Sequence, residues 1–170
     1  MLKSAAAFAI AFSISCAGYL YSKSLETRVK KLEKILLLLS QIKTAIEFTA
    51  DSVETIFSSL SESEDFAALP FVSDCLERMK RGADFFSGWN EALNEKENIF
   101  PLKKEDTALL ASFGSSLGAT DSAGQMRNCE MHERLFEERL RGAIADKDNL
   151  SKPARTVGLL TGAVVLIICL

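Results

Sequence analysis

The charged residues of this chain are concentrated in its middle, and a stretch near each end carries no charge. Of 43 charged side chains, 20 basic and 23 acidic, 42 lie between Lys23 and Arg155, and Lys3 is the exception. Residues 4–22 and 156–170 carry no charge. This placement excludes a disordered chain and a plain soluble globule, because the ends offer water almost no charged surface. It predicts two membrane segments around a charged middle part.

The two uncharged stretches differ in length. Residues 4–22 would form a helix of roughly 28 Å, close to the about 30 Å of a bilayer's hydrocarbon core. Residues 156–170 would form a helix of roughly 22 Å, which requires local thinning of the bilayer. The Gly158-x-x-x-Gly162 spacing in the second stretch would allow another helix to approach closely.

The chain therefore divides into three expected parts. These are an N-terminal transmembrane anchor over residues 1–22, a charged domain over 23–153 and a C-terminal transmembrane segment over 154–170. Basic residues stand at both edges of the charged domain, namely Lys23, Arg28, Lys30, Lys31, Lys34, Lys147, Lys152 and Arg155. The positive-inside rule then places this domain in the cytoplasm and both termini outside. We expect the basic cluster of residues 23–34 to set this topology and to contact lipid headgroups.

A cleaved signal peptide is the alternative for the first stretch. Lys3 supplies a thin positive region, and Ser15-Cys16-Ala17 is an acceptable cleavage site. Cleavage would make the chain an exported protein anchored by its C-terminal segment. The basic cluster favours the uncleaved anchor, because positive charge directly after an apolar segment resists translocation.

The charged domain is expected to be all-α. Apolar residues recur at heptad-like spacing at positions 25, 29, 32, 36 and 39, and Lys43 interrupts the series. This helix should break near Ala50, because Asp51-x-x-Glu54 resembles a capping box. Further helices are predicted over residues 71–81, 85–93 and 109–117 and from 121 onward, with a polar link over 58–68 and a loop over 94–102. About six helices with short connections predict an antiparallel bundle flanked by the two transmembrane helices.

Single residues mark several predicted helix ends. Gly82 should stop the helix over 71–81, and Asp84 should cap the next one. Gly118 should end the helix that precedes it, and Asp121 should start the last helix.

Residues that carry chemistry are scarce. His132 is the single histidine, and Cys129-x-x-His132 with Glu133 offers fewer ligands than a zinc site needs. We expect a core cysteine and a surface histidine there. The sequence contains no phosphate-binding loop, no dinucleotide fingerprint and no nucleophile elbow. A non-catalytic protein without cofactor or metal is therefore predicted, and an enzyme that uses carboxylates around His132 remains the alternative.

One motif links two predicted helices. Residues 113–125 form the pattern F-G-x-x-L-G-x-x-D-x-x-x-Q, in which Gly114 would permit a close helix approach. This pattern resembles that of the stage III sporulation protein AB family, membrane proteins of endospore-forming bacteria. The resemblance extends along nearly the whole chain, including a Trp89-x-x-Ala92-Leu93 step and the sequence Gly-Leu-Leu-Thr-Gly at residues 158–162.

The resemblance implies a function. The soluble part of this family is similar to the cytoplasmic helical domains of platform proteins in type II secretion and type IV pilus machines. It implies a platform in the mother-cell membrane around the forespore, as part of a channel between the two cells. Its expected partners are the other channel proteins, including an ATPase-like protein, together with membrane lipid. Homo-oligomers are left open, and no nucleic acid is expected, because the mildly acidic domain shows no basic stripe. A membrane protein for signalling or sensing is the alternative.

The motif supplies the candidate site residues. They are Trp89, Phe113, Gly114, Leu117, Gly118, Asp121 and Gln125. Core packing or helix-corner geometry is the favoured role for all of them except Gln125, which is as well suited to partner contact. The partner surface itself is expected on the acidic residues 62–65 or on an exposed helix face.

Overall fold

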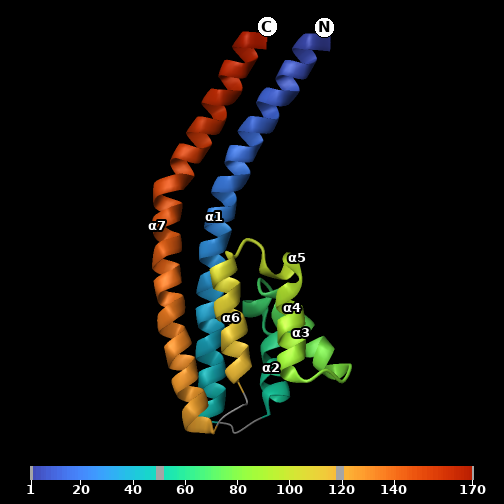
Figure 1. Cartoon of the computed structure of the whole chain (residues 1–170), viewed down its shortest axis with the longest axis vertical. Coiled ribbons are helices and arrows are strands. Elements are labelled where there is room, and N and C mark those ends of the chain that lie inside the picture. The colour runs from blue at the N-terminus through green and yellow to red at the C-terminus, as the bar shows by residue number, and fades with distance from the viewer. Residues whose placement is uncertain (1, 49–51, 118–120, 170) are drawn as a thin grey trace. The chain divides into compact units, whose positions relative to one another are not determined.

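The computed structural model describes residues 2–48, 52–117 and 121–169 (Figure 1). All of the elements in this part of the chain are helices, which confirms the all-α prediction. The two longest are α1 (Leu2–Phe48) and α7 (Ser122–Cys169). Between them lie α2 (Val53–Glu62), the 3-10 helix η1 (Glu64–Phe66), α3 (Pro70–Lys80), α4 (Phe85–Asn94), α5 (Lys96–Ile99) and α6 (Lys104–Ser116).

The chain forms two compact units. Residues 1–29 and 141–170 make the first unit, and residues 30–140 make the second. Both α1 and α7 contribute a segment to each unit. None of the helices in the described residues combines the length and the apolar character needed to cross a bilayer.

The first unit is an antiparallel pair of helix segments from α1 and α7, which lie side by side in Figure 1. Their backbones touch at two glycines: a Cβ added to Gly18 would lie 2.6 Å from the oxygen of Ala154 and 3.2 Å from the Cα of Gly158. No side chain fits between the helices at this point, so Gly158 lies at the close approach that its spacing predicted. Farther along the pair, the buried Arg28 forms an ion pair with Asp146 at 3.4 Å.

The second unit packs around the segment of α1 that it contains. Leu32, Ile35, Leu39 and Ile42 are fully buried along one face of this helix. The heptad-like series therefore continues through Ile35, where the sequence analysis chose residue 36. Lys43, the interruption in the series, donates a hydrogen bond of 2.6 Å to the carboxylate of Glu133 on α7, and this bond raises the pKa of the lysine.

Several predicted helix ends are confirmed. Gly82 follows α3 with a φ of +98°, a left-handed conformation that side chains disfavour. The carboxylate of Asp84 accepts a hydrogen bond from the backbone N–H of Ser87 at 3.0 Å and so caps α4. The cap of α2 differs from the prediction: the Ser52 hydroxyl accepts from the N–H of Thr55 at 3.2 Å, while Asp51 and Ala50 lie outside the described residues.

Two predicted connections contain helix. The link over 58–68 is largely helical, because α2 continues to Glu62 and η1 follows, with Phe66 buried in the core. The loop over 94–102 contains α5. The helix predicted over 109–117 begins at Lys104, because the Asp106 carboxylate accepts from the N–H of Lys103 at 3.0 Å. The described residues thus hold seven α-helices and one 3-10 helix, rather than about six helices between two anchors.

The contact at Gly18 makes a testable prediction. Replacing glycine by alanine inside a helix normally stabilises it by about 0.5–1 kcal/mol. Gly142→Ala, with nothing within 4 Å of the added Cβ, should show this gain. Gly18→Ala should instead destabilise the fold by about 1–3 kcal/mol, because its Cβ meets a backbone oxygen. Thermal unfolding of the full-length variants in detergent measures both, and equal shifts for the two variants would contradict the contact.

Candidate functional site

Trp89 stands at the centre of the family-like motif residues. Its ring is fully buried in the second unit and meets four phenylalanine rings with centroids 5.4–6.3 Å apart, those of Phe57, Phe71, Phe85 and Phe113. The indole N–H donates a hydrogen bond of 2.9 Å to the backbone oxygen of Leu110. The single tryptophan therefore fills the core with its polar atom satisfied.

Gly114 on α6 makes room for this tryptophan. A Cβ added to Gly114 would overlap the indole ring of Trp89, so any larger residue requires the ring to move. Phe113 on the same helix and Leu117, the residue directly after it, are also buried. These motif residues set how closely α6 packs against α4, and none of the three presents an exposed side chain.

Two further motif residues, Asp121 and Gln125, lie where α7 begins. The Asp121 carboxylate accepts a hydrogen bond from the N–H of Gly124 at 2.9 Å and so caps the helix. Gln125 is half-buried, and its N–H donates to the backbone oxygen of Asp121 at 2.9 Å. Gly118 lies outside the described residues.

His132 is buried, so the prediction of a surface histidine is wrong. Its ring is 1 % exposed, its Nδ1 lies 2.9 Å from the backbone oxygen of Asn128, and it meets the Phe113 ring edge-on with centroids 5.4 Å apart. The physical reason is helical periodicity, since Cys129, His132 and Phe136 recur on the buried face of α7.

The cysteines of the second unit, Cys75 and Cys129, are buried thiols, as the sequence predicted for Cys129. Burial raises the pKa of Cys75 to about 12 and that of Cys129 to about 11. Both therefore stay protonated near neutral pH and are poor nucleophiles and metal ligands. Over residues 2–48, 52–117 and 121–169, no three His, Cys, Asp or Glu residues are grouped so that they could hold a metal ion.

Lys31 is a lysine of the second unit whose side chain is buried. It is 6 % exposed, and its ammonium donates to the backbone oxygens of Asn98 at 2.5 Å and of Phe100 at 2.8 Å. Burial lowers its pKa to about 8. Lys31 and Arg28 belong to the basic cluster that was predicted to contact lipid headgroups, whereas both are buried. Their spacing from Leu32 and Ile35 on α1 was the available signal, because all four fall on one helix face.

Arg78 joins three of the short helices. Its guanidinium binds Asp74 at 3.2 Å, Glu91 at 2.6 Å and Glu95 at 3.5 Å, and the hydrogen bonds to Asp74 and Glu91 raise its pKa. Asn98 extends the network by donating to the Asp74 carboxylate at 3.0 Å. The network connects α3, α4 and the start of α5, which indicates a structural role for its charges.

Two of the acidic residues over 62–65, Glu62 and Glu64, border a cavity of about 320 Å³. Asp65 pairs with Lys34 of α1 at 2.7 Å, and Glu62 and Glu64 are exposed. Pro70 and Ser73 also line the cavity. We call the surface formed by Glu62, Glu64, Pro70 and Ser73 the acidic groove.

Comparison with known protein families gives a match over nearly the whole chain. The family model for stage III sporulation protein AB matches residues 3–170. The chain belongs to this family. No curated protein and no solved structure matches it. Membership in the stage III sporulation protein AB family confirms the resemblance carried by the motif and supports a role in sporulation. Within this family member, Trp89, Phe113, Gly114 and Leu117 lie in the core of the second unit.

Lys31 makes the stability of this family member depend on pH. Its pKa of about 8 in the fold lies below its ordinary value of 10.5, so the unfolded chain binds the proton more tightly. The free energy of unfolding should therefore rise between pH 8 and 10.5, by at most about 3 kcal/mol, and stay flat with respect to this group below pH 8.

Lys31→Met removes this contribution. Urea unfolding of the full chain in detergent, followed by Trp89 fluorescence, should show the wild type gaining stability relative to Lys31→Met as the pH rises. Lys80→Met, at an exposed lysine of α3, is the control and should parallel the wild type. Parallel curves for Lys31→Met and wild type would contradict the assignment.

Proposed function

We propose that this chain is a non-catalytic membrane platform of a sporulation channel between mother cell and forespore. Its helical second unit would dock an ATPase-like partner on the cytoplasmic side. The observation that carries the proposal is the family match over residues 3–170. The packing of the motif residues supports it. Motif residues that lie in the core stabilise a rigid scaffold, whereas catalytic residues would have to reach a substrate.

The first unit supports attachment to a membrane. Large apolar side chains point outward on both of its helix segments, with Phe12 of α1 and Ile167 of α7 each 74 % exposed. Water would solvate such a surface poorly, whereas lipid tails would solvate it well. The Gly18–Gly158 contact fits the same proposal, because helices in bilayers associate through small residues that let backbones touch.

The acidic groove supports docking of a basic partner surface. Glu62 and Glu64 are exposed carboxylates beside a cavity, and the buried Phe66 also lines it. Complementary charge across an interface speeds association and excludes wrong partners. A platform that binds its partner at this groove requires no catalytic activity.

Membrane attachment is tested by washing membranes with alkaline carbonate. The wild-type chain should stay in the pellet. Phe12→Arg combined with Leu160→Arg should shift the chain toward the supernatant, because each arginine costs about 2.5–3.5 kcal/mol at the centre of a bilayer. Phe86→Arg, at an exposed phenylalanine of α4, is the control and should remain in the pellet. A wild-type chain released by the wash would refute the attachment.

Partner docking is tested by affinity purification of the full chain from sporulating cells. The wild type should recover an ATPase-like protein, and Glu62→Lys with Glu64→Lys should lose it, because both changes reverse the charge of the acidic groove. Glu137→Lys with Glu138→Lys makes the same change on an exposed face of α7 and should keep the partner. Equal recovery by the two double variants would exclude the acidic groove as the docking surface.

A further inference from the structure

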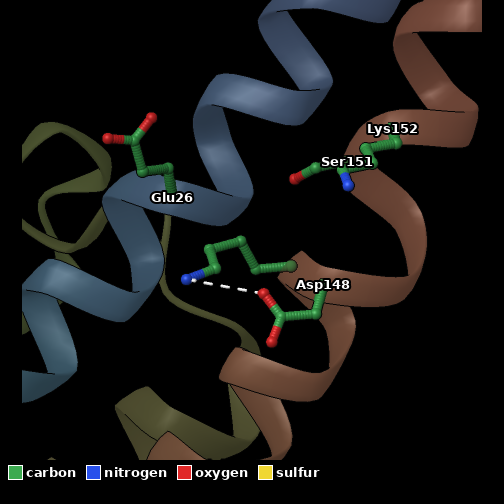
Figure 2. Close-up of a pocket in the computed structure, with 5 residues that line it drawn as sticks. Glu26, Asp148, Ser151 and Lys152 are labelled. Atoms are coloured by element: carbon green, nitrogen blue, oxygen red, sulfur yellow. Dashed lines mark ion pairs between the residues drawn. The ribbon is translucent and has the colours of Figure 1, made fainter.

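The polar side chains of the cavity in the first unit point in different directions. The cavity has a volume of about 470 Å³, and Glu26 of α1 and Lys147 and Asp148 of α7 line it. The Glu26 carboxylate points away from the α7 residues in Figure 2. Asp148 pairs instead with its neighbour Lys147 at 3.6 Å. The charges of this cavity therefore do not act together on one group.

A more apolar groove lies in the second unit, between α4 and α6, and has a volume of about 370 Å³. The α6 residues that line it stand at positions 104, 107, 108 and 111, which is the spacing of one helix face. Five of its nine lining residues are apolar, namely Leu93, Ile99, Leu102, Ala108 and Ala111. We call this surface the α4–α6 groove.

Two exposed phenylalanines flank the α4–α6 groove along the chain. Phe86 lies one turn before the lining residue Asn90 on α4, accepts a hydrogen bond from it at the backbone oxygen, and is 52 % exposed. Phe100 lies between the lining residues Ile99 and Leu102 and is 67 % exposed. Exposed aromatic side chains that border an apolar groove are typical of protein–protein interfaces. The groove is therefore expected to be covered by a segment of another protein.

The dimensions of the groove favour a single helix over a second copy of the chain. Lys104 and Ala111 are seven residues apart on α6, about 10 Å along the helix. An amphipathic helix with anchors at i, i+4 and i+7 covers the same length. A stable interface between two folded chains uses about 20–30 residues on each side, whereas nine residues line this groove.

The charge of the groove selects among such helices. Among the described residues that line it, Lys104 alone carries a charge. Lys104 is exposed at the first position of α6, where the helix dipole adds positive potential. The other polar residues of the lining, Asn90, Asn94 and Thr107, are neutral. A carboxylate on the bound helix would therefore find its favourable partner at the Lys104 end.

We propose that the α4–α6 groove binds an amphipathic helix of a partner protein, with apolar anchors at i, i+4 and i+7 and a carboxylate that meets Lys104. The anchors pack against Leu93 and the two alanines, whose small side chains leave room for another backbone. This inference goes beyond the docking function proposed above. The acidic groove selects a basic surface, whereas this one selects an acidic helix, so the second unit carries two docking surfaces of opposite charge preference.

The test is fluorescence anisotropy with labelled synthetic helices added to the full-length chain in mild detergent, with protein-free micelles as the blank. One peptide carries leucines at i, i+4 and i+7 flanked by glutamates, and the other has lysines in place of the glutamates. The wild type should bind the glutamate peptide about tenfold more tightly, because Lys104 forms a charge-assisted hydrogen bond with it. Equal binding of the two peptides, or binding of neither, would overturn the proposal.

Lys104→Glu should reverse the preference between the two peptides. This variant should keep its fold, because a glutamate in the first turn of a helix is favourable. Unchanged preference in Lys104→Glu would overturn the role given to this lysine.

Ala108→Gln tests the apolar part of the groove. The longer polar side chain should weaken the binding of both peptides about tenfold, because it occupies the space of an anchor. Ala145→Gln, at an exposed alanine of α7, is the matched control and should bind both peptides as the wild type does. Circular dichroism of each variant checks that the helices are intact. Equal binding by the two variants would exclude the groove as the peptide site.

Native mass spectrometry distinguishes the possible occupants. A dimer of the wild type that Ala108→Gln dissociates and Ala145→Gln retains would assign the groove to a second copy and overturn the proposal. Glu62→Lys with Glu64→Lys should bind the glutamate peptide as the wild type does, since the acidic groove is a separate surface. The peptide assay and the recovery of the ATPase-like partner therefore test the two docking proposals independently.

Discussion

The contact between the Trp89 ring and Gly114 is the constraint on which the second unit depends. Because no Cβ fits under the indole, α6 and α4 approach more closely than two ordinary helix faces allow. The ring then touches aromatic side chains from α2, α3 and α6, and its N–H is satisfied by a backbone oxygen of α6. One large residue and one absent side chain thus fix the relative positions of four helices. In a family whose motif contains this glycine, the motif encodes a packing geometry.

Much of the fold could be predicted from the sequence, and the predictions that failed did so for specific physical reasons. Helix ends marked by local chemistry, such as Gly82 and Asp84, were placed correctly because a single backbone conformation or hydrogen bond decides them. The connections over 58–68 and 94–102 were missed because their helical turns are stabilised by distant partners. The 3-10 turn η1 forms where Phe66 packs into the core. The segment around Asn98 is held by a hydrogen bond from Lys31, 67 positions away. Single-sequence periodicity carries no information about such contacts.

The candidate site divides in the same way. The sequence identified the motif residues, but exposure decides between packing and recognition, and the structure places four of them in the core. His132 and Lys31 were predicted to face water because they are polar, and both are buried. Burial of a lone histidine or lysine depends on a neighbouring ring or on backbone oxygens, which here come from α6 and from the end of α5. A charged surface such as the acidic groove can be identified only once the structure shows which charged residues are buried and which are exposed.

The Gly18–Gly158 contact also bears on how the chain is made. The two glycines are separated by 140 positions, so the partner of the first helix segment is synthesised well after it. At about 5–20 residues per second, a ribosome needs roughly 7–28 s to cover that interval. The outward-facing apolar surface of the first segment exists throughout this time without its partner helix. The early segment must therefore find a compatible environment on its own, and the hairpin closes only after the second segment has been made.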